Sequence, residues 1–180
     1  MKCGIGLALG ILLLAGGGRP TQGLAQAAQE TKARATIIDA KGREIGTATL
    51  TQQPNGVLIE AQVSGLQQGT RAFHIHQKGV CETPSFESAG GHFNPTDRKH
   101  GLEVFGGPHA GDLPNIIVGP DGSARASTLN PYVTLGPGKT SLLGEDGTAL
   151  VIHAGRDDYR SQPSGDAGNR IACGRVERGG

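Results

Sequence analysis

Apolar and polar residues alternate along this chain in short runs that are separated by turn residues. A two-residue period is typical of β-strands, because successive side chains point to opposite faces of a strand. No segment keeps the 3.6-residue period of an amphipathic helix over three turns. We therefore predict about eight strands, over residues 33–39, 44–51, 57–63, 71–76, 115–118, 124–129, 148–153 and 170–176.

Turn signals join several of these strands into hairpins. Pro54-Asn55-Gly56 precedes the third strand, and Pro120-Asp121-Gly122 lies between the fifth and the sixth. Both combine residue types that favour tight turns. The number and spacing of the strands predict an all-β domain, an eight-stranded antiparallel Greek-key sandwich or flattened barrel.

Two long segments interrupt the succession of strands. Residues 77–114 and 156–169 contain neither a convincing strand nor a helix. Each of these segments comes soon after a predicted strand that ends in a histidine. Compact domains rarely carry such long loops unless the loops are functional or are held by something else. We predict two functional loops that are ordered by bound metal.

The N-terminal segment has the pattern of a targeting signal. Lys2 provides a positive start, residues 5–15 are apolar but too few to cross a bilayer comfortably, and Ala25-Gln26-Ala27 has the small residues that a signal peptidase recognises. We predict a signal peptide over residues 1–27, a mature domain over residues 28–180, and an extracytoplasmic location in a periplasm or at a cell surface. The alternative is an uncleaved membrane anchor.

The charge of the chain is nearly balanced, with 17 basic and 16 acidic residues, and only 3% of its residues are aromatic. The basic residues are scattered rather than clustered, which argues against a nucleic-acid partner. We also expect no stable membrane insertion once the N-terminal segment is removed. A homodimer is compatible with the sequence, which marks no interface.

Two cysteines, Cys81 and Cys173, remain once the predicted signal peptide is removed. An even pair in an exported protein favours a disulfide bond, the alternative being two free buried thiols. Such a bond would close a loop of about 90 residues, which the chain-entropy description equates with roughly 4–5 kcal/mol of stability.

Six histidines and one aspartate are candidate metal ligands. Neutral imidazole suits copper and zinc, and a carboxylate oxygen can complete a zinc shell. Two of the histidines stand two apart on a predicted strand, so they share one face of it. The candidates are His74, His76, His92, His100, His109, Asp112 and His153.

Several motifs follow one another in a specific order from about residue 73 to residue 174. They are Phe73-His74-Ile75-His76, the segments 90–95 and 107–115, Val151-Ile152-His153 with Asp157-Asp158, and the segment 168–174. Together they resemble the copper/zinc superoxide dismutase family, in particular its exported bacterial type. Several independent motifs in one order are far more specific than any one of them.

The resemblance implies two metal sites that share one ligand. The implied copper ligands are His74, His76, His92 and His153, and the implied zinc ligands are His92, His100, His109 and Asp112. Asp157 is implied to link a copper histidine to a zinc histidine as the hydrogen-bond acceptor that ligand imidazoles need. The alternative for Asp157 is an exposed loop acid.

The resemblance also implies an enzyme, with Arg170 and His92 as its catalytic residues. Its reaction would be the dismutation of superoxide to oxygen and hydrogen peroxide by a copper redox cycle, with zinc as the structural partner metal. Arg170 would hold the superoxide anion, and Cys81–Cys173 would hold the strand of Arg170 against the first loop. One alternative is a non-enzymatic relative that binds zinc or copper, but all four copper positions and Arg170 are present. A copper-delivery protein would need a separate cysteine-based module, which the chain lacks.

Overall fold

Three consecutive strands form an antiparallel meander in the main sheet: β1 (Lys32–Asp39), β2 (Glu44–Gln53) and β3 (Gly56–Val63). The computed structural model describes residues 1–2 and 31–179, so the predicted signal peptide lies outside the described residues apart from its first two. In β1 the small or branched side chains of Ala33, Ala35 and Ile37 are buried and their neighbours are not. This alternation turns one face of the meander into the wall of a core.

The remaining elements are shorter. They are β4 (Gly69–Arg71), β5 (Phe73–His76), the single 3₁₀ turn η1 (Glu87–Ala89), β6 (Ile116–Val118), β7 (Ala124–Asn130), β8 (Ala149–His153), β9 (Arg170–Arg175) and β10 (Glu177–Arg178). All eight predicted strands are present. The prediction differed in two respects, since the fourth strand is divided into β4 and β5, and β10 is additional.

The division of the fourth strand occurs at Ala72, where the chain changes partners. Its N–H donates to Gly155 O at 2.8 Å, and its carbonyl accepts the N–H of His153 at 3.0 Å. Before this residue β4 pairs with β6, and after it β5 pairs with β8. One continuous segment thus passes from the small sheet into the main one.

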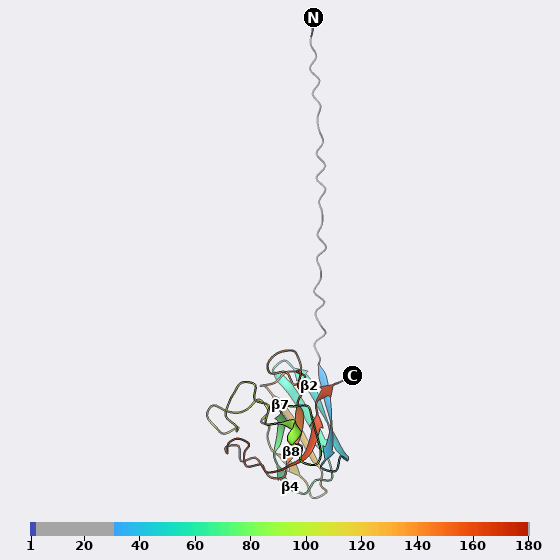
Figure 1. Cartoon of the computed structure of the whole chain (residues 1–180), viewed down its shortest axis with the longest axis vertical. Helices are drawn as coiled ribbons and strands as arrows, with labels where there is room; N and C mark the ends of the chain where they lie inside the picture. Colours follow the sequence, from blue (N-terminus) through green and yellow to red (C-terminus); the bar gives the residue numbers. More distant parts are fainter. Residues whose placement is uncertain (3–30, 180) are drawn as a thin grey trace.

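The strand order confirms the predicted Greek-key barrel. The main sheet runs β5-β8-β9-β1-β2-β3-β7, so the meander is flanked by β9 and β7, which are distant from it in sequence. The two-stranded sheet β4-β6 joins this sheet at both ends, through Ala72 and through the turn in which Gly119 N–H donates to Ser123 O at 2.8 Å. Every paired strand is antiparallel, and the strands curl around one interior (Figure 1).

Two apolar clusters fill the structure. The larger one lies inside the barrel and contains the inward side chains of most strands, among them Leu50, Ile59 and Ile152. The smaller one lies on the other face of β8 and β9, where the first long loop covers the sheet; its buried members are Phe86, Ala89, Ala149, Val151 and Cys173. The loop therefore has a core of its own.

The predicted disulfide is present and anchors this covering loop. Cys81 and Cys173 are 92 residues apart in sequence, with an S–S distance of 1.99 Å, and Cys173 is fully buried in the smaller cluster. The bond ties the loop to β9, the strand that begins with Arg170.

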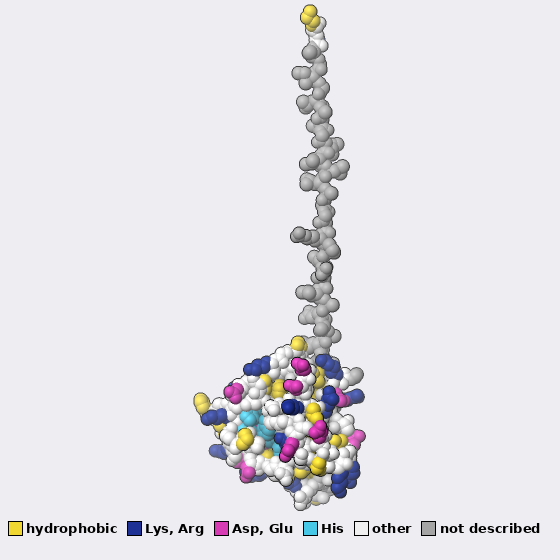
Figure 2. Space-filling view, viewed as in Figure 1, with side chains coloured by type: hydrophobic (Ala, Val, Ile, Leu, Met, Phe, Trp, Pro, Cys, Tyr) yellow, Lys and Arg dark blue, Asp and Glu magenta, His cyan; other side chains and the backbone are white. Residues whose placement is uncertain are grey.

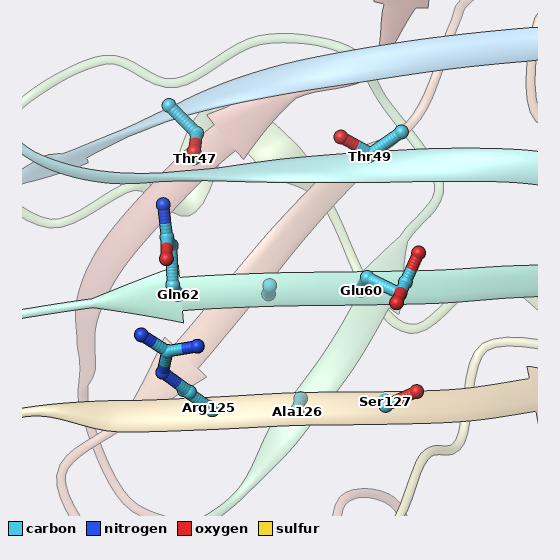
Figure 3. Close-up of a pocket in the computed structure, with 8 residues that line it drawn as sticks. Thr47, Thr49, Glu60, Gln62, Arg125, Ala126 and Ser127 are labelled. Carbon is cyan, nitrogen blue, oxygen red and sulfur yellow. The ribbon is translucent and has the colours of Figure 1, made fainter.

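The outer face of β2, β3 and β7 is polar, in contrast to the interior. Figure 3 shows its side chains in adjacent rows across the three strands, where they line a shallow hollow: Thr47, Thr49, Glu60, Gln62, Arg125 and Ser127. The two long loops lie on another side of the barrel, close to each other (Figure 1). Among the described residues, no helix has the length and apolar character needed to span a membrane.

Replacing both cysteines, Cys81→Ala with Cys173→Ala, should lower the free energy of unfolding by about 2–4 kcal/mol, because the unfolded chain loses a long cross-link. Thermal unfolding measures this change. A reducing agent should lower the melting temperature of the natural chain but not that of the variant. Equal melting of the variant and the natural chain in the absence of reductant would contradict the stabilising role.

Candidate metal centre

The site is assembled by one residue of β5 that pairs with two parts of the first long loop. Ile75 N–H donates to Gly111 O at 2.8 Å, and Ile75 O accepts the N–H of Phe93 at 2.8 Å. A side chain at position 111 would not fit, since a Cβ atom there would lie 2.3 Å from Ile75 O. Glycine at this position allows the loop to lie directly against the strand.

This pairing brings loop ligands next to strand ligands. His92 forms an isolated bridge with His76, and Asp112 forms one with His74. His74 and His76 point away from the barrel interior, whereas Phe73 and Ile75 belong to the main core. The alternation predicted for this strand is therefore observed.

Four imidazole rings converge at this end of β5 and β8, and we call them the four-histidine cluster: His74, His76, His92 and His153. The ring centroids of His74 and His92 are 4.0 Å apart, and those of His76 and His153 are 5.5 Å apart. Candidate ligand atoms of the cluster all lie within 4.8 Å of one another.

Hydrogen bonds on the outer side of three rings determine which nitrogen faces the cluster. His76 Nδ1 donates to Gly90 O at 2.8 Å, His153 Nδ1 donates to Gly168 O at 3.0 Å, and His74 Nε2 donates to Asp157 Oδ2 at 2.8 Å. A neutral imidazole that donates from one nitrogen carries a lone pair on the other. Nδ1 of His74 and Nε2 of His76 and His153 are thus available as ligands.

The second group, which we call the aspartate-containing cluster, comprises His92, His100, His109 and Asp112. Asp112 Oδ1 is 2.9 Å from His92 Nδ1, 3.0 Å from His100 Nδ1 and 3.5 Å from His109 Nδ1. Asp112 Oδ2 accepts the N–H groups of Gly101 and His109, at 2.8 and 3.0 Å. The carboxylate is therefore fixed through one oxygen and offers the other to three rings.

Both clusters fit metal ions. Three buried ring nitrogens have no hydrogen-bond partner among the described residues: His74 Nδ1, His92 Nε2 and His109 Nδ1. A buried polar atom without a partner is costly, and each of these atoms faces one of the clusters. Two nitrogens that each lie about 2.1 Å from one ion can be up to about 4.2 Å apart. The candidate ligand atoms of each cluster lie within 4.8 Å of one another, which is close to this value. Four imidazoles suit copper, and three imidazoles with one carboxylate suit zinc.

His92 belongs to both clusters. Its Nδ1 lies beside Asp112 Oδ1, and its Nε2 is one of the unpartnered nitrogens. No other residue in the described part of the chain belongs to both groups. The two candidate sites are therefore joined by a single ring.

Asp157 joins the same two clusters on their other side. Its Oδ2 accepts from His74 Nε2, and its Oδ1 is 3.1 Å from His100 Nε2. Its exposed fraction is only 2%, so it is not the exposed loop acid of the alternative interpretation. The side chain of Asn115 holds its backbone, with Oδ1 accepting Asp157 N–H at 2.8 Å and Nδ2 donating to Asp157 O at 2.9 Å.

Burial keeps the four-histidine cluster neutral in the absence of metal. It lowers the pKa of His74 to about 3, that of His76 to about 2 and that of His153 to about 4. The cause is that a protonated ring would be charged in a site with little water. Neutral rings are the form that binds metal.

The aspartate-containing cluster has a different balance. Burial opposes the ionisation of Asp112, but its contacts with the rings of His100, His109 and His92 outweigh burial and hold the pKa of this carboxyl well below its usual value. Burial likewise disfavours protonation of His100, yet its hydrogen bonds to Asp112 and Asp157 raise the pKa of this ring to about 9. In the metal-free protein a proton on His100 offsets part of the carboxylate charge.

Arg170 lies opposite His153, as its pairing partner at the start of β9. Its Nη1 donates to Phe86 O at 2.5 Å, and its Nη2 donates to Gly90 O at 2.6 Å. Gly90 O also accepts from His76, so one carbonyl holds both side chains. The fixed cation therefore lies next to the four-histidine cluster.

The histidines are reached from the side of the barrel that carries the long loops. His92 and His109 are 9% and 8% exposed, and Figure 2 shows histidine side chains at the surface there. Sequence reasoning did not single out Asn115 or the Gly90 carbonyl. Asn115 ends the motif 107–115, but a backbone carbonyl leaves no signal in a sequence.

Comparisons with known proteins identify one family. The model of the family described as copper/zinc superoxide dismutase matches residues 44–176. A protein of Aquifex aeolicus named superoxide dismutase [Cu-Zn] 1 is 55% identical over 83% of the chain and 90% of its own length. An extracellular superoxide dismutase [Cu-Zn] of Brugia pahangi is 37% identical over 79% of the chain and 73% of its own length. The crystal structure of a SOD-like protein from Bacillus subtilis superposes with a TM-score of 0.77 at 39% identity, covering 80% of this chain and 97% of that one.

Gly165→Ala should displace Asp157, because the new Cβ would lie 1.8 Å from Asp157 Oδ1 and 2.8 Å from His100 Nε2. Gly65→Ala is a matched control, since Gly65 has a φ of +74° against +71° for Gly165 and no atom within 4 Å of its Cβ position. Both substitutions carry the left-handed strain of about 1–2 kcal/mol. Only Gly165→Ala should also weaken zinc binding, measured by chelator competition. Equal effects of the two on stability and zinc affinity would show that the Asp157 contact is unimportant.

The metal-free protein should be most stable near pH 6.5. Below this value the unfolded chain binds protons on His74, His76 and His153, while the folded chain does not. The free energy of unfolding therefore falls as the pH drops toward 4, by about 1.4 kcal/mol per pH unit for each fully titrating ring. Above pH 6.5 the raised pKa of His100 acts in the opposite direction, and its contribution is lost as the pH rises through about 9. Chemical unfolding across this range measures the effect. The metal-loaded protein is the comparison and should lose at least as much stability between pH 6.5 and 5, because its metal-bound rings take up no protons while the unfolded chain does. A flat metal-free profile would contradict the burial argument.

Proposed function

The chain belongs to the copper/zinc superoxide dismutase family. We propose that one of its two clusters holds the redox metal of the reaction and that the other holds a structural metal. The protein is a superoxide dismutase, which converts superoxide to oxygen and hydrogen peroxide with copper and zinc as cofactors. The residues that hold each metal, and the roles of Arg170 and His92, are our assignment.

We assign copper to the four-histidine cluster and zinc to the aspartate-containing cluster. Four nitrogen ligands match the preference of Cu(II), and a closed set of three imidazoles and one carboxylate matches structural zinc. When bound, copper supplies the alternating one-electron oxidation and reduction of superoxide, while zinc has no redox chemistry. The alternative of a non-enzymatic metal-binding relative is less well supported, because the full set of candidate ligands and Arg170 is present.

The observation that carries this proposal is the shared ring of His92. Its Nδ1 is held beside Asp112 while its buried Nε2 has no protein partner, so Nε2 can hold a proton without a change in the position of the ring. Peroxide formation consumes two protons, and a nitrogen at this place can deliver one of them. We assign His92 this proton-holding role.

Arg170 is assigned to hold the superoxide anion. Two of its five N–H groups are used by the carbonyls of Phe86 and Gly90, which fixes the plane of the guanidinium and leaves other donors free to bind substrate. A fixed cation next to the cluster attracts a small anion and orients it. The disulfide contributes indirectly, since it ties Phe86's loop to the strand of Arg170.

We further propose that the protein is exported, with cleavage after residue 27 leaving a mature domain over residues 28–180. The disulfide supports an oxidising compartment, and one similar protein is named as extracellular. Both the cleavage and a homodimer stay predictions. The basic residues are scattered along the sequence, so we propose no nucleic-acid partner. The substrate is the small molecule superoxide.

His153→Ala and His109→Ala form a matched pair that tests the assignment, because each removes one ring from one cluster only. Removing a hydrogen-bond partner of a metal ligand commonly costs about 10–100-fold in affinity or activity, so loss of a ligand should cost more. His153→Ala should therefore lower superoxide dismutation by more than about a hundredfold and retain one zinc per chain. His109→Ala should weaken zinc binding and leave the four-histidine cluster complete.

Metal analysis with an assay of superoxide consumption measures both outcomes. The Gln62→Ala variant, on the polar outer face of β3, serves as a control for substitution itself. Full activity in His153→Ala, or loss of zinc rather than copper from it, would contradict the copper assignment.

A further inference from the structure

His100 is held at every one of its polar atoms. Its ring Nδ1 is 3.0 Å from Asp112 Oδ1, and its ring Nε2 is 3.1 Å from Asp157 Oδ1. Its backbone N–H donates to Gln162 Oε1 at 2.9 Å, and its carbonyl accepts from Gln162 Nε2 at 2.8 Å. The residue is completely buried. One side chain thus supplies both contacts to the backbone of His100.

Gln162 binds this backbone as a neighbouring β-strand would, with one donor and one acceptor. Its second Nε2–H donates to Arg160 O at 3.0 Å, so both of its amide hydrogens are used. The contact to Arg160 fixes the side chain to its own loop while the other two reach across to residue 100. A long surface side chain loses rotamer freedom when it is fixed in this way, and the three hydrogen bonds offset this loss.

Asn115 makes the same arrangement in the opposite direction. It lies between the first long loop and β6 and binds the backbone N–H and carbonyl of Asp157 in the second long loop. Gln162 belongs to the second loop and binds the backbone N–H and carbonyl of His100 in the first. Between these two carboxamides lies the contact of Asp157 Oδ1 with His100 Nε2.

A further side-chain link between the two loops is weaker. The ion pair of Arg160 with Glu103 joins side chains that are 69% and 49% exposed. Such pairs contribute little to stability because water and salt screen them. The carboxamide contacts are better placed to determine where the ring of His100 lies.

We propose that Gln162 is a positioning residue of the aspartate-containing cluster, which fixes His100 for zinc and transmits the order of the second loop to it. This inference rests on the proposed function, because it takes the cluster as the zinc site. Gln162 acts through His100 and touches no candidate ligand atom. Through Asp157 the same contacts reach His74 of the four-histidine cluster.

The test compares Gln162→Met, which keeps the length of the side chain but not its hydrogen bonds, with Gln162→Ala, which removes both. The Gln62→Ala variant is the control, since Gln62 is an exposed glutamine on the outer face of β3 (Figure 3). Zinc affinity of the metal-free proteins is measured by chelator competition. Cobalt(II) in place of zinc gives visible absorption bands that report the geometry of the ligands.

Both Gln162 variants should bind zinc about 10–100-fold more weakly than the natural chain, and their cobalt bands should shift. The control should match the natural chain in both measurements. Similar losses in the Met and Ala variants would show that hydrogen bonds matter rather than packing.

Unchanged zinc affinity and an unchanged cobalt spectrum in Gln162→Met would overturn the inference, and so would a lower melting temperature without either change, since Gln162 would then only stabilise its loop. Neither result affects the proposed function. That proposal fails separately, if the natural chain binds no zinc at this cluster or does not consume superoxide.

Discussion

The backbone of Ile75 is the point on which the metal centre depends. Its N–H and carbonyl, at one position of a four-residue strand, pair with residues 111 and 93 of the same loop. This double pairing brings His92 beside His76 and Asp112 beside His74. It requires that Gly111 carry no side chain, so a single glycine permits the loop to contribute ligands to both clusters.

The electrostatics of the site follow from this dense packing. Seven ligand groups and Asp157 are nearly excluded from water, which makes protonation of the four-histidine cluster costly and leaves three ring nitrogens without partners. Those costs are part of the free energy of folding of the metal-free protein. Metal binding removes them, so binding and folding are coupled at this site. The disulfide and the small apolar cluster around Phe86 hold the covering loop independently of metal.

Local patterns in the sequence were sufficient for much of this structure. Alternation predicted all eight strands, and the turn signals at Asn55-Gly56 and Asp121-Gly122 predicted two of their connections. The resemblance of ordered motifs indicated which histidines belong together, and the structure brings those groups together. The division of the fourth strand at Ala72 was missed because it arises from a change of pairing partner, to which a strand's own residues give no clue. The same reason applies to Asn115 and Gln162, whose side chains bind backbone groups that any residue would offer.

The side chains of Asn115 and Gln162 help to explain why the four-histidine cluster and the aspartate-containing cluster are not independent. The second loop carries Asp157 and leads into Arg170, yet its position is fixed largely by contacts to the loop that carries His100 and Asp112. The ring of His100 contacts Asp157, and Asp157 orients the His74 ring so that its Nδ1 faces the four-histidine cluster. With the proposed assignment, a redox-silent metal in the aspartate-containing cluster would influence a redox metal in the four-histidine cluster through geometry alone. The shared ring of His92 gives one such route, and the contacts of His100, Asp157 and Gln162 give a second that involves no common ligand.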